Sequence, residues 1–250
     1  MIRINKKGEA PEILRTKGET LKNDLIGQAD AGEDNFKFSS DVYADKTVKE
    51  QLLEDQHRKC AYCEQSKNGD FGCVEHFRPK GGYDTYVNNS LVKPGYYWLA
   101  YEWDNLLFSC SECNTSCKKN HFPLIDENGR DILHRRISNE DPAIINPADE
   151  DPGNFIEFSE YIVRPKLIDG KENIKGRTTI DIFRLNERND LKERRKQKWM
   201  EYKDLCLFRK VLIKQHIDTS FLDSFILKFN SDDEEFCGMF RHQVSNIDSE

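Results

Sequence analysis

The sequence contains no run of about 18 apolar residues, the length that a membrane-spanning helix requires. Its first seven residues also lack the apolar stretch of a secretory signal peptide, so we expect a cytoplasmic protein. Basic residues are in deficit, with 38 Lys and Arg against 45 Asp and Glu and a formal net charge of −7. This charge argues against a free-standing nucleic-acid binder of high affinity, which usually has a basic surface.

Disulfide bonds are not expected among the eight cysteines, because the cytoplasm keeps thiols reduced. Four of the cysteines instead form two CxxC pairs, Cys60-Ala-Tyr-Cys63 and Cys110-Ser-Glu-Cys113. Two such pairs supply the tetrahedral shell of four sulfurs that zinc prefers, at about 2.3 Å per bond. The sequence therefore predicts a structural zinc ion bound by these four cysteines. The other four are expected to be small core residues, although Cys117 could replace a zinc ligand because it lies one helical turn after Cys113.

The expected elements combine helices with short strands, so the predicted fold class is α+β. Residues 1–45 have few apolar positions and are predicted to form an irregular arm. Residues 46–125 are predicted to form the zinc-bound core. Within it we expect a helix over 46–59, a hairpin or a strand ending in a loop over 71–78, a helix over the aromatic run 96–103 and a short helix over 114–120.

The second half of the chain begins with a stretch that is rich in Gly and Pro. Residues 126–186 are predicted to be a loop-rich connector with one hairpin. Residues 187–250 are predicted to form a helical carboxy-terminal part, led by an amphipathic helix to about residue 217. A basic run at residues 192–198 lies near the start of this helix, where it opposes the helix macrodipole. Two interpretations stay open for this run: an external anionic contact or a solvated face.

The 46 residues between the two CxxC pairs carry the groups that phosphodiester hydrolysis needs. They exceed the roughly 15 to 20 residues of a simple zinc ribbon, which leaves room for a catalytic segment. Glu75 is a hard oxygen ligand suited to Mg²⁺ or Mn²⁺, and the adjacent His76 is of a type that accepts a proton from water near neutral pH. Arg78 and Lys80 are candidates for contact with a substrate phosphate.

The order CxxC, Glu-His, Asn, CxxC-Asn along the chain resembles the zinc-bound form of the HNH endonuclease motif. The resemblance implies a ββα-metal core that is held together by zinc. It also implies that His76 is the general base, that Asn105 orients the loop of the base, and that Glu75 and Asn114 bind a catalytic Mg²⁺ or Mn²⁺. Family members often have His where this chain has Asn114, so His121, seven residues further on, is another candidate ligand.

Longer segments resemble the nuclease subunit of Septu and Septu-like retron defence systems. The similarity spans roughly residues 57 to 195 and includes Glu75-His76-Phe77-Arg78-Pro79-Lys80, the aromatic segment 97–106, Phe122-Pro123-Leu124 and Asn146-Pro147. It implies an ABC-type ATPase as partner and, in retron versions, a reverse transcriptase with its RNA–DNA product.

Together with the residue chemistry, the resemblance implies a metal-dependent HNH endonuclease that cleaves nucleic acid, with DNA favoured, as the effector of a bacterial anti-phage defence complex. Two alternatives stay open. One is an RNA-cleaving HNH effector, because attack by external water does not require a 2′-hydroxyl. The other is a non-catalytic scaffold module that zinc stabilises.

Overall fold

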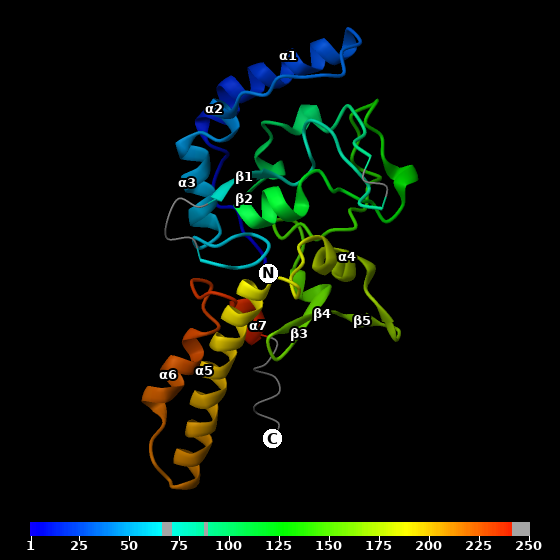
Figure 1. The fold of residues 1–250 in the computed structure, drawn as a ribbon. Helices are drawn as coiled ribbons and strands as arrows, with labels where there is room; N and C mark the ends of the chain where they lie inside the picture. Colours follow the sequence, from blue (N-terminus) through cyan, green and yellow to red (C-terminus); the bar gives the residue numbers. More distant parts are fainter. Residues whose placement is uncertain (67–71, 88–89, 242–250) are drawn as a thin grey trace.

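The computed structural model describes residues 1–66, 72–87 and 90–241, and its fold combines helices with small two-stranded antiparallel sheets (Figure 1). Labels with η mark short 3₁₀ or π helices. In chain order the elements are η1 (Leu14–Gly18), α1 (Glu19–Asp30), α2 (Ser40–Tyr43), α3 (Lys46–Asp55), β1 (Gly72–His76), η2 (Tyr97–Leu99), η3 (Trp103–Asn105), β2 (Leu106–Cys110), η4 (Glu112–Lys118), η5 (Glu127–Gly129), η6 (Pro152–Asn154), β3 (Ile156–Ser159), β4 (Ile162–Pro165), β5 (Leu167–Ile168), β6 (Lys171–Glu172), α4 (Ile174–Ile182), α5 (Asn189–Lys214), α6 (Ser220–Lys228) and α7 (Cys237–Arg241). The predicted α+β class is confirmed.

Among the helices in the described ranges, none has the combination of length and apolar content that crossing a membrane requires. The domain boundaries after residues 45, 125 and 186 stay predictions. Residues 242–250 of the predicted carboxy-terminal part lie outside the described residues.

The amino-terminal segment is more regular than the sequence analysis expected. The prediction of an irregular arm was wrong for residues 14–30, which form η1 and α1. Leu25 of α1 is buried, and Leu21, Ile26 and Ala29 pack partly buried against the core, at a helical spacing that the sequence analysis overlooked. The segment is tied to the rest of the chain further upstream, where the Ile4 amide donates a hydrogen bond to the Pro147 carbonyl at 2.7 Å.

Strands β1 and β2 form the sheet that organises the amino-terminal half. They pair antiparallel, with Gly72 opposite Cys110 and His76 opposite Leu106. Every residue of β2 is buried, and α3, which buries Val48 and Leu52, contacts it. The strand predicted over 71–78 is confirmed for residues 72–76, whereas residue 71 lies outside the described residues. The helix predicted over 46–59 is confirmed as far as Asp55.

The aromatic run between β1 and β2 does not form the single helix that was predicted. It folds into two short 3₁₀ helices, η2 and η3, that are separated by residues 100–102, of which Glu102 is extended. Tyr97, Trp98 and Trp103 are all buried. Packing of these large rings into the core overrides the regular helical geometry that their spacing suggested. The helix predicted after Cys113 is present as the π helix η4 and begins two residues earlier than expected.

The carboxy-terminal half contains the predicted hairpin, β3 paired with β4, and the predicted long helix, α5. Figure 1 shows α5 and α6 extending together from the rest of the molecule. The basic run on α5 has partners within the chain: Arg194 Nη2 lies 2.7 Å from Glu235 Oε1, and Lys198 Nζ lies 3.4 Å from Glu234 Oε2. These two cations are therefore already paired without an external anion.

Candidate metal and nuclease site

The four cysteines of the two CxxC pairs converge in one buried cluster. Their Sγ atoms all lie within 4.8 Å of one another, and Cys63 Sγ is 3.8 Å from Cys110 Sγ. A tetrahedron with zinc–sulfur bonds of about 2.3 Å has sulfur–sulfur edges of roughly 3.8 Å. The cluster is therefore positioned to bind one metal ion, and both its donor chemistry and its spacing fit structural zinc.

Hydrogen-bond donors surround the sulfurs. The Cys110 amide lies 3.4 Å from Cys60 Sγ, and the Cys113 amide lies 3.5 Å from Cys110 Sγ. Arg188, the residue that precedes α5, is buried and places Nη1 3.1 Å from Cys113 Sγ. Because four thiolates exceed the charge of Zn²⁺ by about two, this guanidinium offsets part of the excess. The contact also fixes the start of α5 against the cluster.

The two alternative ligands lie elsewhere. Cys117 Sγ donates to the Phe183 carbonyl at 3.6 Å and is not a member of the four-cysteine cluster. His121 Nδ1 is 2.5 Å from Asp84 Oδ1, and the His121 ring packs edge-on against Tyr86. His121 is not among the residues that line the cavity around His76.

His76 is the last residue of β1, and its imidazole is buried. Its Nε2 lies 2.9 Å from the Ala100 carbonyl, which only accepts hydrogen bonds, so Nε2 carries the ring proton. Nδ1 then has a free lone pair, and it accepts a hydrogen bond from Lys80 Nζ at 3.2 Å. Burial lowers the pKa of His76 well below its usual value, and the charge of Lys80 lowers it further. The imidazole is therefore neutral at physiological pH, the form that a general base requires.

Asn105 holds the two segments that surround His76. Its Oδ1 accepts a hydrogen bond from the Arg78 amide at 2.8 Å, and its Nδ2 donates to the Arg78 and Leu99 carbonyls at 3.0 and 3.1 Å. Leu99 immediately precedes Ala100, the partner of the His76 ring. Asn105 thus ties the segment at Arg78 to the segment at Leu99, next to the Ala100 carbonyl that His76 contacts.

Glu75 is buried beside a fully buried lysine. Lys118 Nζ lies 2.6 Å from Glu75 Oε1 and donates to the His76 carbonyl at 3.0 Å. Burial raises the pKa of Glu75, while the positive charge of Lys118 opposes that rise. Lys118 thus fixes both the carboxylate and the end of β1.

Asn114 follows Cys113 directly and lies within η4. Its Nδ2 lies 2.8 Å from Cys73 Sγ. Within the described residues, no hydrogen bond to its Oδ1 is recorded, which leaves this oxygen available to a ligand.

A cavity of about 450 Å³ joins these residues. Glu75, His76, Lys80 and Asn114 all line it, together with Tyr43 from α2. The Tyr43 ring meets the His76 ring edge-on at 4.7 Å and carries Lys80 Nζ at 4.4 Å from its centre. Segments that are far apart in the sequence therefore build one hollow around the imidazole.

Arg78 and Lys80 do not lie together, although the sequence analysis gave both the same role. Lys80 lines the cavity of His76, where burial lowers its pKa to about 8. Arg78 Nε is instead 2.9 Å from Glu140 Oε2, and Arg78 lines a different cavity. The ion pair with Glu140 engages Nε of the guanidinium.

Sequence reasoning missed Lys118, Tyr43 and Arg188 as parts of these two sites. Lys118 and Arg188 belong to residue types that are mostly exposed, and nothing in a local pattern marks a buried cation. Tyr43 lies in the segment that was predicted to be irregular. Its contact with His76 depends on tertiary packing across more than thirty residues.

Comparison with known proteins places the chain in a family. No family model matches it. A protein named Septu protein PtuB, from Bacillus mycoides (strain KBAB4), is 34% identical to it over 200 residues, which cover 78% of this chain and 66% of the relative. The chain belongs to the Septu PtuB family. It is therefore a component of a Septu defence system, as the resemblance predicted.

Two further relatives fit this assignment. Another protein named Septu protein PtuB, from Bacillus thuringiensis, is 31% identical over 178 residues, or 70% of this chain and 55% of the relative. The match thus spans about two thirds of one PtuB relative and about half of the other. A protein named Septu protein PtuA, from Bacillus mycoides (strain KBAB4), is 29% identical over 149 residues, which are 59% of this chain and 20% of that protein.

Proposed function

We propose that the chain is a metal-dependent HNH endonuclease, which hydrolyses phosphodiester bonds of nucleic acid as the effector of its Septu system. DNA is the substrate that the family resemblance favours. The observation that supports this most strongly is the cavity in which a neutral, oriented His76 lies beside Glu75 and Asn114. A base and two hard oxygen donors in one hollow are the protein groups that such hydrolysis needs.

In this proposal the zinc ion has a structural role and sets the position of the catalytic groups. Cys110 ends β2, which pairs with the strand that carries Glu75 and His76, and Cys113 immediately precedes Asn114. The four-sulfur cluster therefore fixes Asn114 relative to Glu75. The β1–β2 pair followed by η4 would be the ββα core that the resemblance implies.

The base in this proposal is His76 Nδ1. The Ala100 carbonyl holds the proton on Nε2, and Asn105 holds the neighbouring Leu99 carbonyl, so the Nδ1 lone pair keeps its direction. Lys80 Nζ covers that lone pair at 3.2 Å. An entering phosphate group would attract the Lys80 ammonium and free Nδ1 to accept a proton from water.

Glu75 and Asn114 would hold the catalytic divalent ion. They offer a carboxylate and an amide oxygen, which suit Mg²⁺ or Mn²⁺, and Mg²⁺ usually retains several waters and needs few protein ligands. When bound there, such an ion would polarise the scissile phosphate and offset the charge on the leaving oxygen. Lys118 would keep Glu75 ionised despite its burial.

The proposed partner is a PtuA-type protein of the same system. Support comes from membership of the PtuB family and from the shared similarity with part of a protein named PtuA. The ABC-type ATPase, and the reverse transcriptase with its RNA–DNA product, are implied by the family resemblance and stay predictions.

The decisive variant is His76→Ala, with His134→Ala as its control. His134 is an exposed histidine whose ring pairs, among the described residues, with Asp131 alone, so its loss tests the effect of removing an imidazole outside the cavity. Both proteins are assayed with zinc bound and Mg²⁺ present, alone and together with the PtuA-type protein of the same genome. We expect His76→Ala to lose at least about 100-fold in cleavage rate. Normal cleavage by His76→Ala would remove the assignment of the base.

A further inference from the structure

Helix α5 carries four exposed residues that form a stripe along one face: Asp204, Leu207, Val211 and Lys214. They are spaced three, four and three residues apart, which places them on the same side of a helix. The side chains of Leu207 and Val211 are 61% and 43% exposed. Within the described residues, neither Asp204 nor Lys214 has an ion pair.

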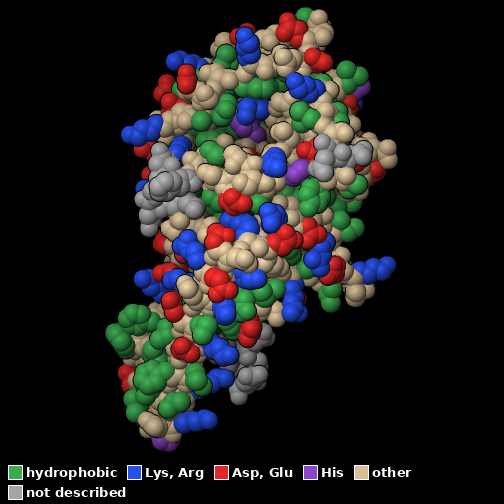
Figure 2. Space-filling view, in the orientation of Figure 1, with side chains coloured by type: hydrophobic (Ala, Val, Ile, Leu, Met, Phe, Trp, Pro, Cys, Tyr) green, Lys and Arg blue, Asp and Glu red, His purple; other side chains and the backbone are tan. Residues whose placement is uncertain are grey.

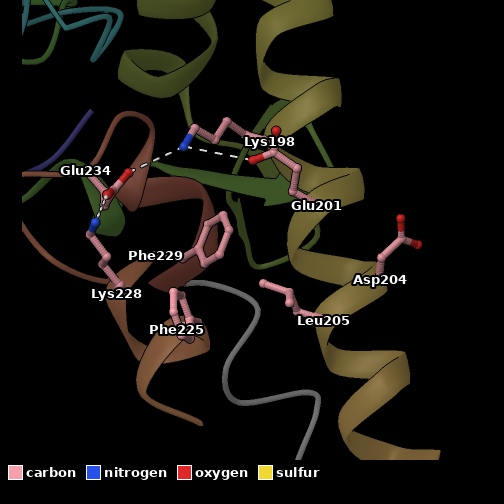
Figure 3. Close-up of a pocket in the computed structure, with 8 residues that line it drawn as sticks. All are labelled: Lys198, Glu201, Asp204, Leu205, Phe225, Lys228, Phe229 and Glu234. Carbon is pink, nitrogen blue, oxygen red and sulfur yellow. Dashed lines mark hydrogen bonds and ion pairs between the residues drawn. The ribbon is translucent and has the colours of Figure 1, made fainter. Parts of the chain in front are cut away.

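The stripe faces away from the rest of the molecule. The opposite side of α5 meets α6, where the Tyr202 and Phe229 rings are 5.4 Å apart and Arg209 Nε lies 2.5 Å from Asp223 Oδ1. Figure 3 shows the same division one residue apart: Leu205 points toward the side of Phe225, whereas the Asp204 carboxylate points away from it. The packing of α5 on α6 therefore leaves the stripe uncovered.

The stripe is complementary to itself when it runs in the reverse direction. Leu207 and Val211 each lie two residues from Arg209, and Asp204 and Lys214 each lie five residues from it. A two-fold axis beside residue 209 would thus set Leu207 against Val211 of the second copy, and Asp204 against Lys214 of the second copy, each of them twice. An isologous interface needs this kind of symmetry.

We propose that a second copy of this chain binds the stripe, with the two α5 helices antiparallel. The charge pattern selects this occupant. The stripe reads acidic, apolar, apolar, basic, so in an antiparallel pair each acidic position faces a basic one and each apolar position faces an apolar one. This inference goes beyond the proposed nuclease activity and does not depend on it.

The shape of the molecule permits such a pairing. Figure 1 shows the distal end of α5 projecting with α6 from the body, and Figure 2 shows that the hydrophobic side chains visible at this end gather mainly over α6. The helices would overlap over residues 204–214, about 16 Å, so the two bodies would lie at opposite ends of the pair. Phe208, which is 54% exposed, lies within the overlap next to Leu207 of the stripe and adds apolar area. An overlap this short gives a weak, concentration-dependent dimer.

The test is sedimentation velocity of the full chain with zinc, from roughly 1 to 200 μM, the range in which a weak dimer dissociates. We expect the mass to rise toward that of a dimer. Asp204→Lys sets two lysines opposite each other at both ends of the overlap, and Lys214→Asp sets two aspartates there. Each variant alone should dimerise at least about tenfold more weakly. An equimolar mixture of the two should recover the wild-type affinity as a heterodimer, because every charge again faces its opposite.

Glu193→Lys is the matched control, since it makes the same charge change on an exposed α5 residue outside the overlap. It should dimerise like the wild type, and zinc content and circular dichroism should be unchanged in all variants. A chain that stays monomeric over the whole range would overturn the proposal. Charge variants that dimerise normally, or a mixture that fails to recover the wild-type affinity, would also overturn it. The same holds if the stripe is needed only for binding the PtuA-type protein.

Discussion

Lys118→Met is the substitution whose consequence the structure defines most sharply. Methionine has nearly the same length as lysine but no charge. The substitution therefore removes one partner of the buried ion pair with Glu75 and still fills the space of the lysine side chain. Lys118 Nζ is 2.6 Å from Glu75 Oε1, and both side chains are buried. Breaking a buried pair from one side typically costs about 3–5 kcal/mol, because the remaining charge is uncompensated.

Removing both charges should cost less than removing one. In Glu75→Gln with Lys118→Met no buried charge is left unpaired, and we expect a loss of about 1–2 kcal/mol, mainly from hydrogen bonds such as the one to the His76 carbonyl. The free energy of unfolding is measured by urea titration at constant zinc concentration, followed by circular dichroism. The double-mutant cycle then gives the coupling between the two residues.

The cost of Lys118→Met should also depend on pH in a defined direction. Burial already raises the pKa of Glu75 above its ordinary value of 4.5, and loss of Lys118 raises it further. Since the folded state then binds the proton more tightly than the unfolded state, stability is lost as pH rises through this window. The deficit of the variant should therefore be smaller at pH 5 than at pH 8. A cost below about 1 kcal/mol, or one that is equal at both pH values, would refute the reasoning about this pair.

Three further predictions concern the two sites. Cys63→Ser should lower bound zinc below one ion per chain and abolish cooperative unfolding, because structural zinc contributes directly to folding. Elemental analysis and thermal melts check this prediction. Full zinc occupancy in the variant would contradict it. Asn105→Ala should keep zinc but lower the cleavage rate at saturating substrate by at least about tenfold. The variant loses the hydrogen bonds to the Leu99 and Arg78 carbonyls, which hold the segments on both sides of His76. Unchanged kinetics would argue against that role. Cleavage should decline as pH rises through about 8, where Lys80 loses its charge, and Lys80→Arg should remove that decline; a wild-type profile that stays flat to pH 9.5 would contradict the phosphate role of Lys80.

The parts of the fold that could be predicted from sequence are those with local signals. The CxxC spacing predicted the four-sulfur cluster because each pair forms its knuckle within four residues. The strand that carries Glu75 and His76, and the helices over 46–55 and 189–214, follow from apolar periodicity between breakers. The resemblance to the HNH motif brought His76, Asn105 and Asn114 into one hypothesis, and the structure places His76 and Asn114 around the same cavity.

The parts that could not be predicted depend on tertiary packing. Lys118 becomes a buried partner of Glu75 only after η4 packs against β1. The adjacent Lys119 is the same residue type in the same local sequence, yet it is exposed. Arg78 Nε pairs with Glu140, more than sixty residues away in sequence, a contact that no local pattern marks, and the phosphate contact of Arg78 stays a prediction. Helix α1 was missed for a different reason, because its few apolar residues do have helical spacing but stand among many polar ones. The aromatic run folds as two 3₁₀ helices because its rings pack into the core.

The central claim is that the chain uses two kinds of metal in separate roles, and one titration tests it directly. The chain, alone and with its PtuA-type protein, is treated with EDTA mildly enough to spare zinc in a thiolate cluster, and then Mg²⁺ is added back while zinc content and nucleic-acid cleavage are measured together. The account predicts one zinc ion retained per chain, no cleavage after chelation, and recovery of cleavage with Mg²⁺. Folded protein without zinc, or cleavage that no divalent ion restores, would contradict it.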